Sequence, residues 1–250
     1  MTGVSAPLAT VDVLGVPFHV LTVENALAQL VAWLEEGESP MRVVATPNPE
    51  GVMQARRNPA FAAALQAADL CLADGTGIVW AARRLGTPLP HRVRGVDTIF
   101  ALLQRLEDRQ RPTTAYFLGG APAVAERAAA HMQARFSHVT VVGHHHGFFS
   151  PEEEDTIRAD IARTRPDILL VCTGMPRAEL WATAHRHLPV RVALCLGGTL
   201  DIMAGTARMA PAWLRAIGLE WLYRLTRQPA RWRRQLDIPR FVWAVLRKKG

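Results

Sequence analysis

The sequence has no long apolar run, little cysteine and almost no lysine. No stretch approaches the roughly 18 apolar residues of a membrane-spanning helix, and the start lacks the basic and apolar parts of a secretion signal. The three cysteines, Cys71, Cys172 and Cys195, are far apart, and each lies in an apolar run. We therefore expect buried thiols in a reducing compartment rather than a disulfide or a zinc site.

Several common ligand-binding signatures are also missing. The chain has neither the Gly-x-Gly-x-x-Gly of dinucleotide-binding folds nor the Walker pattern, and no Gly-x-Ser-x-Gly or Cys/His arrangement indicates covalent catalysis. His144, His145 and His146 suggest a metal site, but no acidic partner stands at a useful spacing. A polar loop after a strand is therefore the preferred interpretation of the three histidines.

Positive charge is concentrated at one end of the chain. Residues 208–250 contain 11 Lys or Arg against two acids, Glu220 and Asp237, a net charge of +9. The remaining residues carry 18 basic and 20 acidic groups, a net charge of −2. This asymmetry indicates an anionic partner, which could be a nucleic acid, a phosphorylated ligand or a membrane surface.

Apolar runs of strand length alternate with alanine- and leucine-rich stretches of helical spacing. The expected strands are 42–46, 70–73, 114–119, 139–143, 167–174 and 190–198, and the expected helices are 23–36, 49–67, 97–110, 121–135, 151–164 and 176–187. Strands that are apolar throughout and separated by helices predict a mostly parallel sheet with helices on both faces. The expected fold is α/β and Rossmann-like, preceded by a small hairpin over 11–21.

The pattern changes near the C-terminus, and we divide the chain into an α/β core over 1–205 and a basic helical appendage over 206–250. The appendage is expected to contain one helix from Pro211 to a break at Gln228–Pro229. A second, basic helix then runs to a break near Ile238–Pro239.

Aromatic residues are interleaved with arginines throughout the appendage. They are Trp213, Trp221, Tyr223, Trp232 and Trp243. Rings with one polar edge, set beside cations, suit a surface that lies on anionic lipid. The alternative is that the rings pack the appendage onto the core and the arginines are only solvated.

Polar residues and glycines gather where the expected strands end, which is the edge at which parallel α/β sheets bind ligands. Asp74 follows strand 70–73 with Gly75 and Gly77 beside it, a good position for a general base with room for a ligand. The alternative is that Asp74 caps a helix over 76–85. The local pattern does not separate the two.

Two further strand ends carry candidate ligand contacts. Thr46 and Asn48 could donate hydrogen bonds into the same cleft as Asp74, or could serve only as turn residues before a helix. Gly119-Gly120-x-Pro122 stands between a strand and a helix. It is a candidate phosphate cradle, because the free N–H groups and the dipole of a helix start favour an anion.

Taken in order, these stretches resemble the WecG/TagA/CpsF family of glycosyltransferases, family 26, from about residue 10 to about residue 236. The matching motifs are Thr46 with Asn48, Asp74-Gly75-x-Gly77, Arg92-x-x-Gly95-x-Asp97, Gly119-Gly120-x-Pro122, Gly147-Phe148-Phe149 and Gly174-x-Pro176-x-x-Glu179. The stretch GLEWLYRL over 218–225 matches the C-terminal motif of the family, together with Pro229, Arg224, Arg231 and Arg234. Each motif is weak alone, and the ordered set carries the resemblance.

The resemblance implies an inverting transfer of a sugar from a UDP donor to a polyprenyl-diphosphate-linked saccharide, with no metal or other cofactor required. The sugar would be glucose, N-acetylmannosamine or its uronic acid, used in a cell-surface polysaccharide or a teichoic-acid-type linkage. The protein would be cytoplasmic and peripheral on the inner face of the plasma membrane, with an anionic membrane surface as a partner. Self-association as a homo-oligomer is compatible with this family, and nucleic acid is not an expected partner.

The same resemblance assigns roles to single residues. Asp74 matches the proposed base that deprotonates the acceptor hydroxyl, Thr46, Asn48 and Arg92 lie beside it, and Asp201 matches an acidic residue that holds the nucleoside. Tail arginines would meet the diphosphates in place of a metal. The residues expected to bind substrate are Gly75, Gly77, Gly119, Gly120, Gly174, Pro176, Glu179, Asp201, Arg224, Arg231 and Arg234.

Two positions depart from the family pattern. Ala178 stands where the family usually carries glutamine, and Met209 replaces the arginine of Arg-Ala-Pro, with Arg208 one position earlier. These departures bear on which donor is used, and they keep open a catalytically silent membrane scaffold of the same fold. A third alternative is a nucleic-acid-binding tail, which predicts salt-sensitive affinity for DNA or RNA and indifference to UDP.

Overall fold

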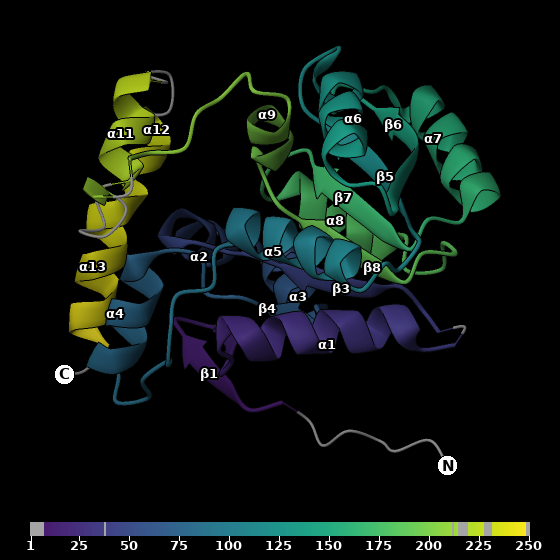
Figure 1. The fold of residues 1–250 in the computed structure, drawn as a ribbon. Helices are drawn as coiled ribbons and strands as arrows, with labels where there is room; N and C mark the ends of the chain where they lie inside the picture. The colour runs from purple at the N-terminus through teal and green to yellow at the C-terminus, as the bar shows by residue number, and fades with distance from the viewer. Residues whose placement is uncertain (1–7, 38, 212, 215–219, 228–231, 249–250) are drawn as a thin grey trace.

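The computed structural model describes residues 8–37, 39–211, 213–214, 220–227 and 232–248, except the side chains of Arg224, Arg227 and Arg233. The first described elements are the strands β1 (Thr10–Val13) and β2 (Val16–His19), which form an antiparallel hairpin and confirm the expected one. A six-stranded sheet follows, and all of its neighbouring strands pair in parallel (Figure 1). Its strands, in spatial order, are β4 (Leu70–Cys71), β3 (Arg42–Ala45), β8 (Val192–Cys195), β7 (Ile168–Cys172), β5 (Thr113–Gly119) and β6 (Val139–His145).

Different helices cover the two faces of this sheet. One face packs against α1 (Val23–Glu35), α5 (Gly95–Asp108), α6 (Val124–Arg135) and α9 (Thr199–Met203). The other packs against α3 (Pro59–Ala67), α7 (Pro151–Thr164) and α8 (Arg177–Ala184). The expected α/β fold with a mostly parallel sheet is confirmed.

The sequence of strand β8 is apolar throughout because both of its faces are buried. Val192 and Leu194 point into the first of these layers, and Ala193 and Cys195 point into the second, so all four residues are buried.

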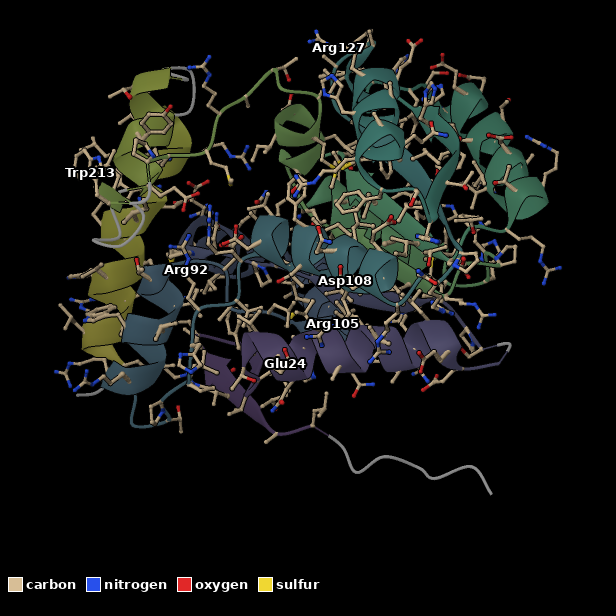
Figure 2. All side chains as sticks on the ribbon, in the orientation of Figure 1. Glu24, Arg92, Arg105, Asp108, Arg127 and Trp213 are labelled. Atoms are coloured by element: carbon tan, nitrogen blue, oxygen red, sulfur yellow. The ribbon has the colours of Figure 1, made fainter. Side chains whose placement is uncertain are left out.

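At the molecular surface an arginine links two helices of the first layer. Arg105 of α5 donates to both carboxylate oxygens of Glu24 in α1, at 2.8 and 2.7 Å (Figure 2).

The expected helix over 49–67 is two helices. Asn48 caps α2 (Pro49–Ala55) by accepting the N–H of Gly51, and Asn58 caps α3 by accepting the N–H of Phe61. Each cap is followed by a proline, a residue that suits the first turn of a helix and not its interior. Asn58–Pro59 is therefore a second helix start, and the single-helix prediction was wrong.

Three helices of the appendage are described: α11 (Glu220–Arg227), α12 (Trp232–Gln235) and α13 (Asp237–Arg247). The expected break at Gln228–Pro229 lies outside the described residues. The break expected near Ile238–Pro239 lies two residues earlier, at Leu236, because α12 ends at Gln235 and α13 begins at Asp237 with Pro239 in its first turn. The N–H that proline lacks has no intrahelical partner there, so the helix tolerates it.

The last helix packs tightly against the core. Phe241 and Val245 of α13 are buried among Val52 of α2 and Ile78 of α4 (Thr76–Arg84), and α13 runs beside α4 in Figure 1. None of the helices in the described part of the chain is long and apolar enough to cross a membrane. The division at residues 205 and 206 remains a prediction.

Replacing Phe241 with alanine should lower the free energy of unfolding by about 3 to 5 kcal/mol, because it removes a large side chain that is only 1% exposed. Denaturant unfolding measures the loss. Val242→Ala is the matched control on the same helix, and at 38% exposure it should cost much less. Equal losses in the two variants would contradict the packing of α13 onto the core.

Candidate functional site

Asp74 lies in the loop between β4 and α4 and faces the start of α5. The N-cap of α4 is Gly75, so the alternative in which Asp74 caps this helix is wrong. The Asp74 Oδ2 accepts the backbone N–H of Gly95 at 3.4 Å, and its Oδ1 lies 3.8 Å from the Arg92 guanidinium. With 28% of its side chain exposed, Asp74 is held in place and remains accessible to a ligand.

The neighbouring strand ends meet at the topological switch point of the sheet. From β3, the chain adds β4 on one side and β5 to β8 on the other, and ligands bind in such a crevice in open α/β sheets. The Thr46 hydroxyl donates to the carbonyl of Cys195 at 2.9 Å and so joins the ends of β3 and β8. A Cβ at Gly95 would lie 3.0 Å from the Thr46 methyl, so glycine lets α5 approach the strand ends. Thr46, Gly95 and Asp74 therefore converge.

A buried ion-pair network connects this crevice to the appendage. One oxygen of Glu220, the first residue of α11, accepts from Arg92 at 2.6 Å, and the other accepts from Arg94 at 2.9 Å. The side chains of Glu220 and Arg94 are only 10% and 7% exposed. Burial lowers the pKa of Arg94, but the charges of Glu220, Asp97 and Asp74 outweigh it and raise that pKa above its ordinary value.

Neither Glu220 nor Arg94 was assigned a role from the sequence. A signal was available, because Glu220 and Asp237 are the two acids of the basic tail. Both carboxylates are buried and pair with core arginines. Asp237 binds Arg57 through two hydrogen bonds of 2.9 and 2.6 Å, and this pairing lowers its pKa.

Asn48 is the N-cap of α2, which agrees with the alternative interpretation of this residue as part of a turn before a helix. Its side-chain oxygen accepts the N–H of Gly51 at 2.9 Å, which leaves the donors of its amide group for a ligand. A Cβ at Gly77 would lie 2.8 Å from the ring of Pro49, so close packing of two strand ends is sufficient reason for that glycine. The roles of Asn48, Gly75 and Gly77 in sugar binding remain predictions.

A second group of predicted residues follows the other strands. Gly119 is the last residue of β5 and Gly120 follows it, and both have positive φ angles, 145° and 73°. A Cβ at Gly119 would lie 2.5 Å from the backbone of Cys172, so the turn requires glycine to approach β7. Gly174 has a φ angle of 82° and open space beside it, before a cis bond to Pro176.

Asp201 and Glu179 differ sharply in exposure. Asp201 is half-buried in the first turn of α9, beside Gly198. Glu179 of α8 is only 2% exposed, and its Oε2 has no hydrogen-bond partner among the residues that the structure describes. Burial raises its pKa to about 7, opposed in part by a backbone N–H. Glu179 is therefore a buried acid with a pKa close to neutral pH, and almost none of its surface is accessible for direct contact with a large substrate.

The structure places one of the three predicted tail arginines. The Arg234 Nε lies 3.8 Å from Glu50, two residues after Asn48, so α12 approaches the same strand end. Arg224 lies in α11, but its side chain is outside the described residues, as is the whole of Arg231. Figure 2 shows Arg92 on the side of the core that faces the C-terminal helices.

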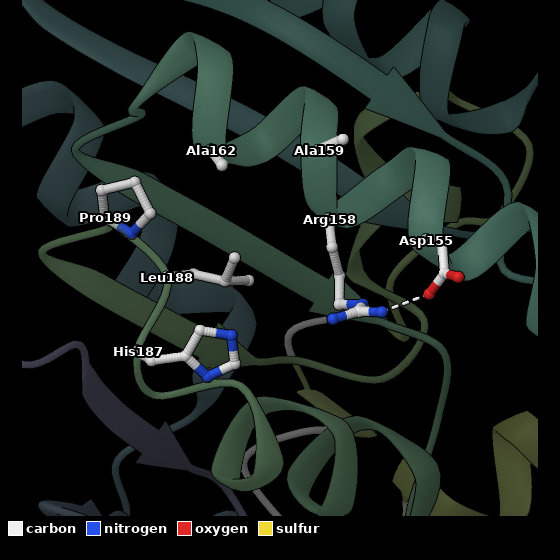
Figure 3. Close-up of a pocket in the computed structure, with 7 residues that line it drawn as sticks. All are labelled: Asp155, Arg158, Ala159, Ala162, His187, Leu188 and Pro189. Atoms are coloured by element: carbon white, nitrogen blue, oxygen red, sulfur yellow. Dashed lines mark hydrogen bonds and ion pairs between the residues drawn. The ribbon is translucent and has the colours of Figure 1, made fainter.

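Two hollows on the surface lie away from this crevice. One cavity of about 360 Å³ is lined by α7 and by the loop before β8 (Figure 3). A second, of about 540 Å³, shares the same loop. Since Leu188 and Pro189 precede β8, both cavities lie toward the amino ends of the parallel strands, opposite the edge with the candidate site.

Comparisons with known proteins find similarity over nearly the whole chain. The model of the glycosyl transferase WecG/TagA/CpsF family matches residues 11–250. The N-acetylglucosaminyldiphosphoundecaprenol N-acetyl-beta-D-mannosaminyltransferase of Bacillus spizizenii is 34% identical over 229 residues, 90% of this chain and 88% of that protein. A protein of the same name from Staphylococcus aureus is 30% identical over 242 residues, 96% of this chain and 94% of its own.

The buried Glu179 predicts a pH dependence of stability. Its pKa in the folded chain is about 7 against an ordinary 4.5, so the folded state holds this proton more tightly. Stability is therefore highest below the ordinary pKa and falls as the pH rises through the folded pKa. The free energy of unfolding should be measured in urea at about pH 5 and about pH 8 for the wild type and for Glu179→Gln. Between these two pH values the wild type should lose about 2 to 3 kcal/mol of stability relative to the variant, because the glutamine side chain does not ionise.

The exposed Glu35→Gln provides the control for this measurement, since its carboxylate is 54% exposed. Its stability relative to the wild type should stay constant over the same interval. A Glu179→Gln variant that also keeps a constant difference from the wild type would contradict a buried, protonated glutamic acid.

Proposed function

The chain belongs to the WecG/TagA/CpsF family of glycosyltransferases, and we propose that it transfers N-acetylmannosamine from a UDP donor to N-acetylglucosaminyl-diphosphate-polyprenol. The observation that carries this proposal is the position of Asp74 at the switch point, in contact with Gly95 and close to Arg92. The relatives from Bacillus and Staphylococcus are named for this transfer. Glucose and the uronic acid are the alternative donor sugars.

In the proposed reaction, Asp74 removes the proton from the acceptor hydroxyl as that oxygen attacks the anomeric carbon. The bond between the sugar and UDP breaks, and its electron pair leaves with the diphosphate. A single displacement of an α-linked sugar gives the β linkage in the names of the relatives, so the reaction inverts the configuration. The contacts to Gly95 and Arg92 hold the carboxylate in one orientation, which a base needs before substrate arrives.

We assign the UDP donor to the ends of β5, β7 and β8. The glycine turn at Gly119 and Gly120 precedes α6, whose N-terminus favours phosphate, and Asp201 stands where it can accept from a nucleoside. The tail arginines supply positive charge for the leaving diphosphate in place of a metal ion. This assignment leaves Asp74 on the acceptor side of the crevice.

The appendage is assigned to an anionic membrane surface at the inner face of the plasma membrane. Phe241 packs inward, whereas Trp213, Trp232 and Trp243 are 64%, 53% and 57% exposed, beside a surplus of arginine. In this assignment the buried Phe241 packs the appendage onto the core, and the exposed tryptophans contact lipid. A lipid-linked acceptor would reach the crevice from that surface.

Binding to lipid vesicles tests this assignment. The double substitution of Trp243 and Leu246 by alanine should weaken partition into anionic vesicles by about tenfold, since it removes apolar surface that lipid would cover. Val23→Ala, an exposed apolar change on α1, is the control and should bind as the wild type does. Equal binding by all three proteins would contradict a membrane role for α13.

Asp74→Asn tests the proposed base. The amide keeps the size of the side chain but accepts no proton, so turnover should fall by at least about 10²-fold while UDP affinity stays close to that of the wild type. Asp108→Asn, on the exposed end of α5, should retain full turnover. Turnover by Asp74→Asn at the wild-type rate would remove Asp74 from the mechanism.

The function itself is tested by mass spectrometry of transfer products. The protein is mixed with UDP-N-acetylmannosamine, its uronic acid or UDP-glucose, and with a short-chain acceptor, in the presence of a chelator. Product from UDP-N-acetylmannosamine alone is the expected result. Product only from another donor would correct the sugar, and no product and no UDP binding would favour the silent scaffold.

A further inference from the structure

The end of β6 and the start of α7 bring two histidines and a glutamate together. Among the residues that the structure describes, His145, His146 and Glu153 each offer a ligand atom, and these atoms lie within 4.8 Å of one another. The expectation that no acidic side chain reaches the histidines is therefore wrong. β6 runs on to His145, and the start of α7 brings Glu153 back to the end of this outermost strand (Figure 1).

The hydrogen bonding of His145 prepares its ring for a metal. Its Nδ1 lies 2.9 Å from the backbone carbonyl of His146. A carbonyl can only accept, so Nδ1 is the donor, and in the neutral ring the lone pair is then on Nε2. Metal-binding histidines are commonly oriented in this way, because the second nitrogen donates to a carbonyl or a carboxylate.

The helix cap of α7 holds Glu153 in position. Its Oε2 accepts the N–H of Ser150 at 2.7 Å, and the Ser150 hydroxyl accepts the N–H of Glu153 at 3.3 Å, a capping box that leaves Oε1 for another partner. The ring of His146 is held less firmly, because its Nδ1 makes only a long hydrogen bond, accepting the N–H of Phe148 at 3.3 Å. Metal binding by His146 would replace only that weak contact.

We propose that His145, His146 and Glu153 form a binding site for a divalent transition-metal ion of the zinc type, with water completing its coordination. Two imidazoles and one carboxylate are a ligand set that zinc uses in proteins. Ligands at about 2.1 Å in a tetrahedron lie about 3.4 Å apart, a separation that rotation of these partly exposed side chains would reach. The proposal concerns binding alone and does not rest on the proposed sugar transfer.

The ion would fix a loop that touches the glycine turn. The N–H of Gly147 donates to the carbonyl of Gly120 at 2.8 Å, and Arg177 of α8 donates to the carbonyl of Gly147 at 2.7 Å. The Arg177 guanidinium also lies 4.2 Å from the ring centre of Phe149. A metal ion bound between β6 and α7 would therefore stabilise the loop over 146–150, which contacts Gly120.

The test is zinc binding by the full chain with any purification tag removed, measured by calorimetry. The wild type should bind about one Zn²⁺ at this site, and His145→Ala and His146→Ala should each bind at least about tenfold more weakly, because each loses a direct ligand. His144→Ala is the matched control, a neighbouring exposed histidine outside the cluster, and should bind as the wild type does.

Glu153→Gln separates the ligand from the helix cap. Glutamine serves in a capping box, so this variant should keep the thermal stability of the metal-free protein and still bind zinc more weakly. The proposal is overturned if the wild type does not bind zinc, if either histidine variant binds as tightly as the wild type, if His144→Ala weakens binding equally, or if Glu153→Gln keeps full affinity.

Discussion

The appendage depends on two buried carboxylates that hold a strongly basic segment against a core with arginines of its own. Glu220 accepts from Arg92 and Arg94, and Asp237 accepts from Arg57. A buried charge is tolerated only when it is paired, so the buried carboxylates of Glu220 and Asp237 require these arginines in the docked arrangement. The net charge of +9 would otherwise favour separation of the tail from Arg92 and Arg94. The two acids therefore determine where the appendage docks.

This docking determines the surroundings of Asp74. Arg92 stands between two carboxylates, 2.6 Å from Glu220 and 3.8 Å from Asp74, so α11 positions the guanidinium that faces the candidate base. The sheet supplies the other half of the arrangement, because the ends of β3, β4 and β8 meet at the switch point. The surroundings of Asp74 thus depend on the position of a segment more than a hundred residues further along the chain.

The sequence predicted the sheet well because buried parallel strands are continuous apolar runs, and β8 is one of them. It predicted Asp74, Thr46 and Arg92 as neighbours because each follows a strand end or matches a family motif. It did not predict the break at Asn58, since an asparagine–proline pair inside an alanine-rich stretch looks locally like a helix with one poor residue. Glu220 and Glu153 were missed for another reason: their partners come from distant segments, and no local pattern records such pairs.

The most direct test of this account is the turnover of Glu220→Gln, measured at a temperature at which circular dichroism shows the variant to be folded. Glutamine keeps the shape but not the charge that holds Arg92 and Arg94. We expect turnover to fall by at least about tenfold, because the change displaces Arg92 beside Asp74 and loosens the docking of the appendage that carries the tail arginines. Turnover equal to the wild type in a folded variant would show that docking of the appendage through Glu220 does not organise the site.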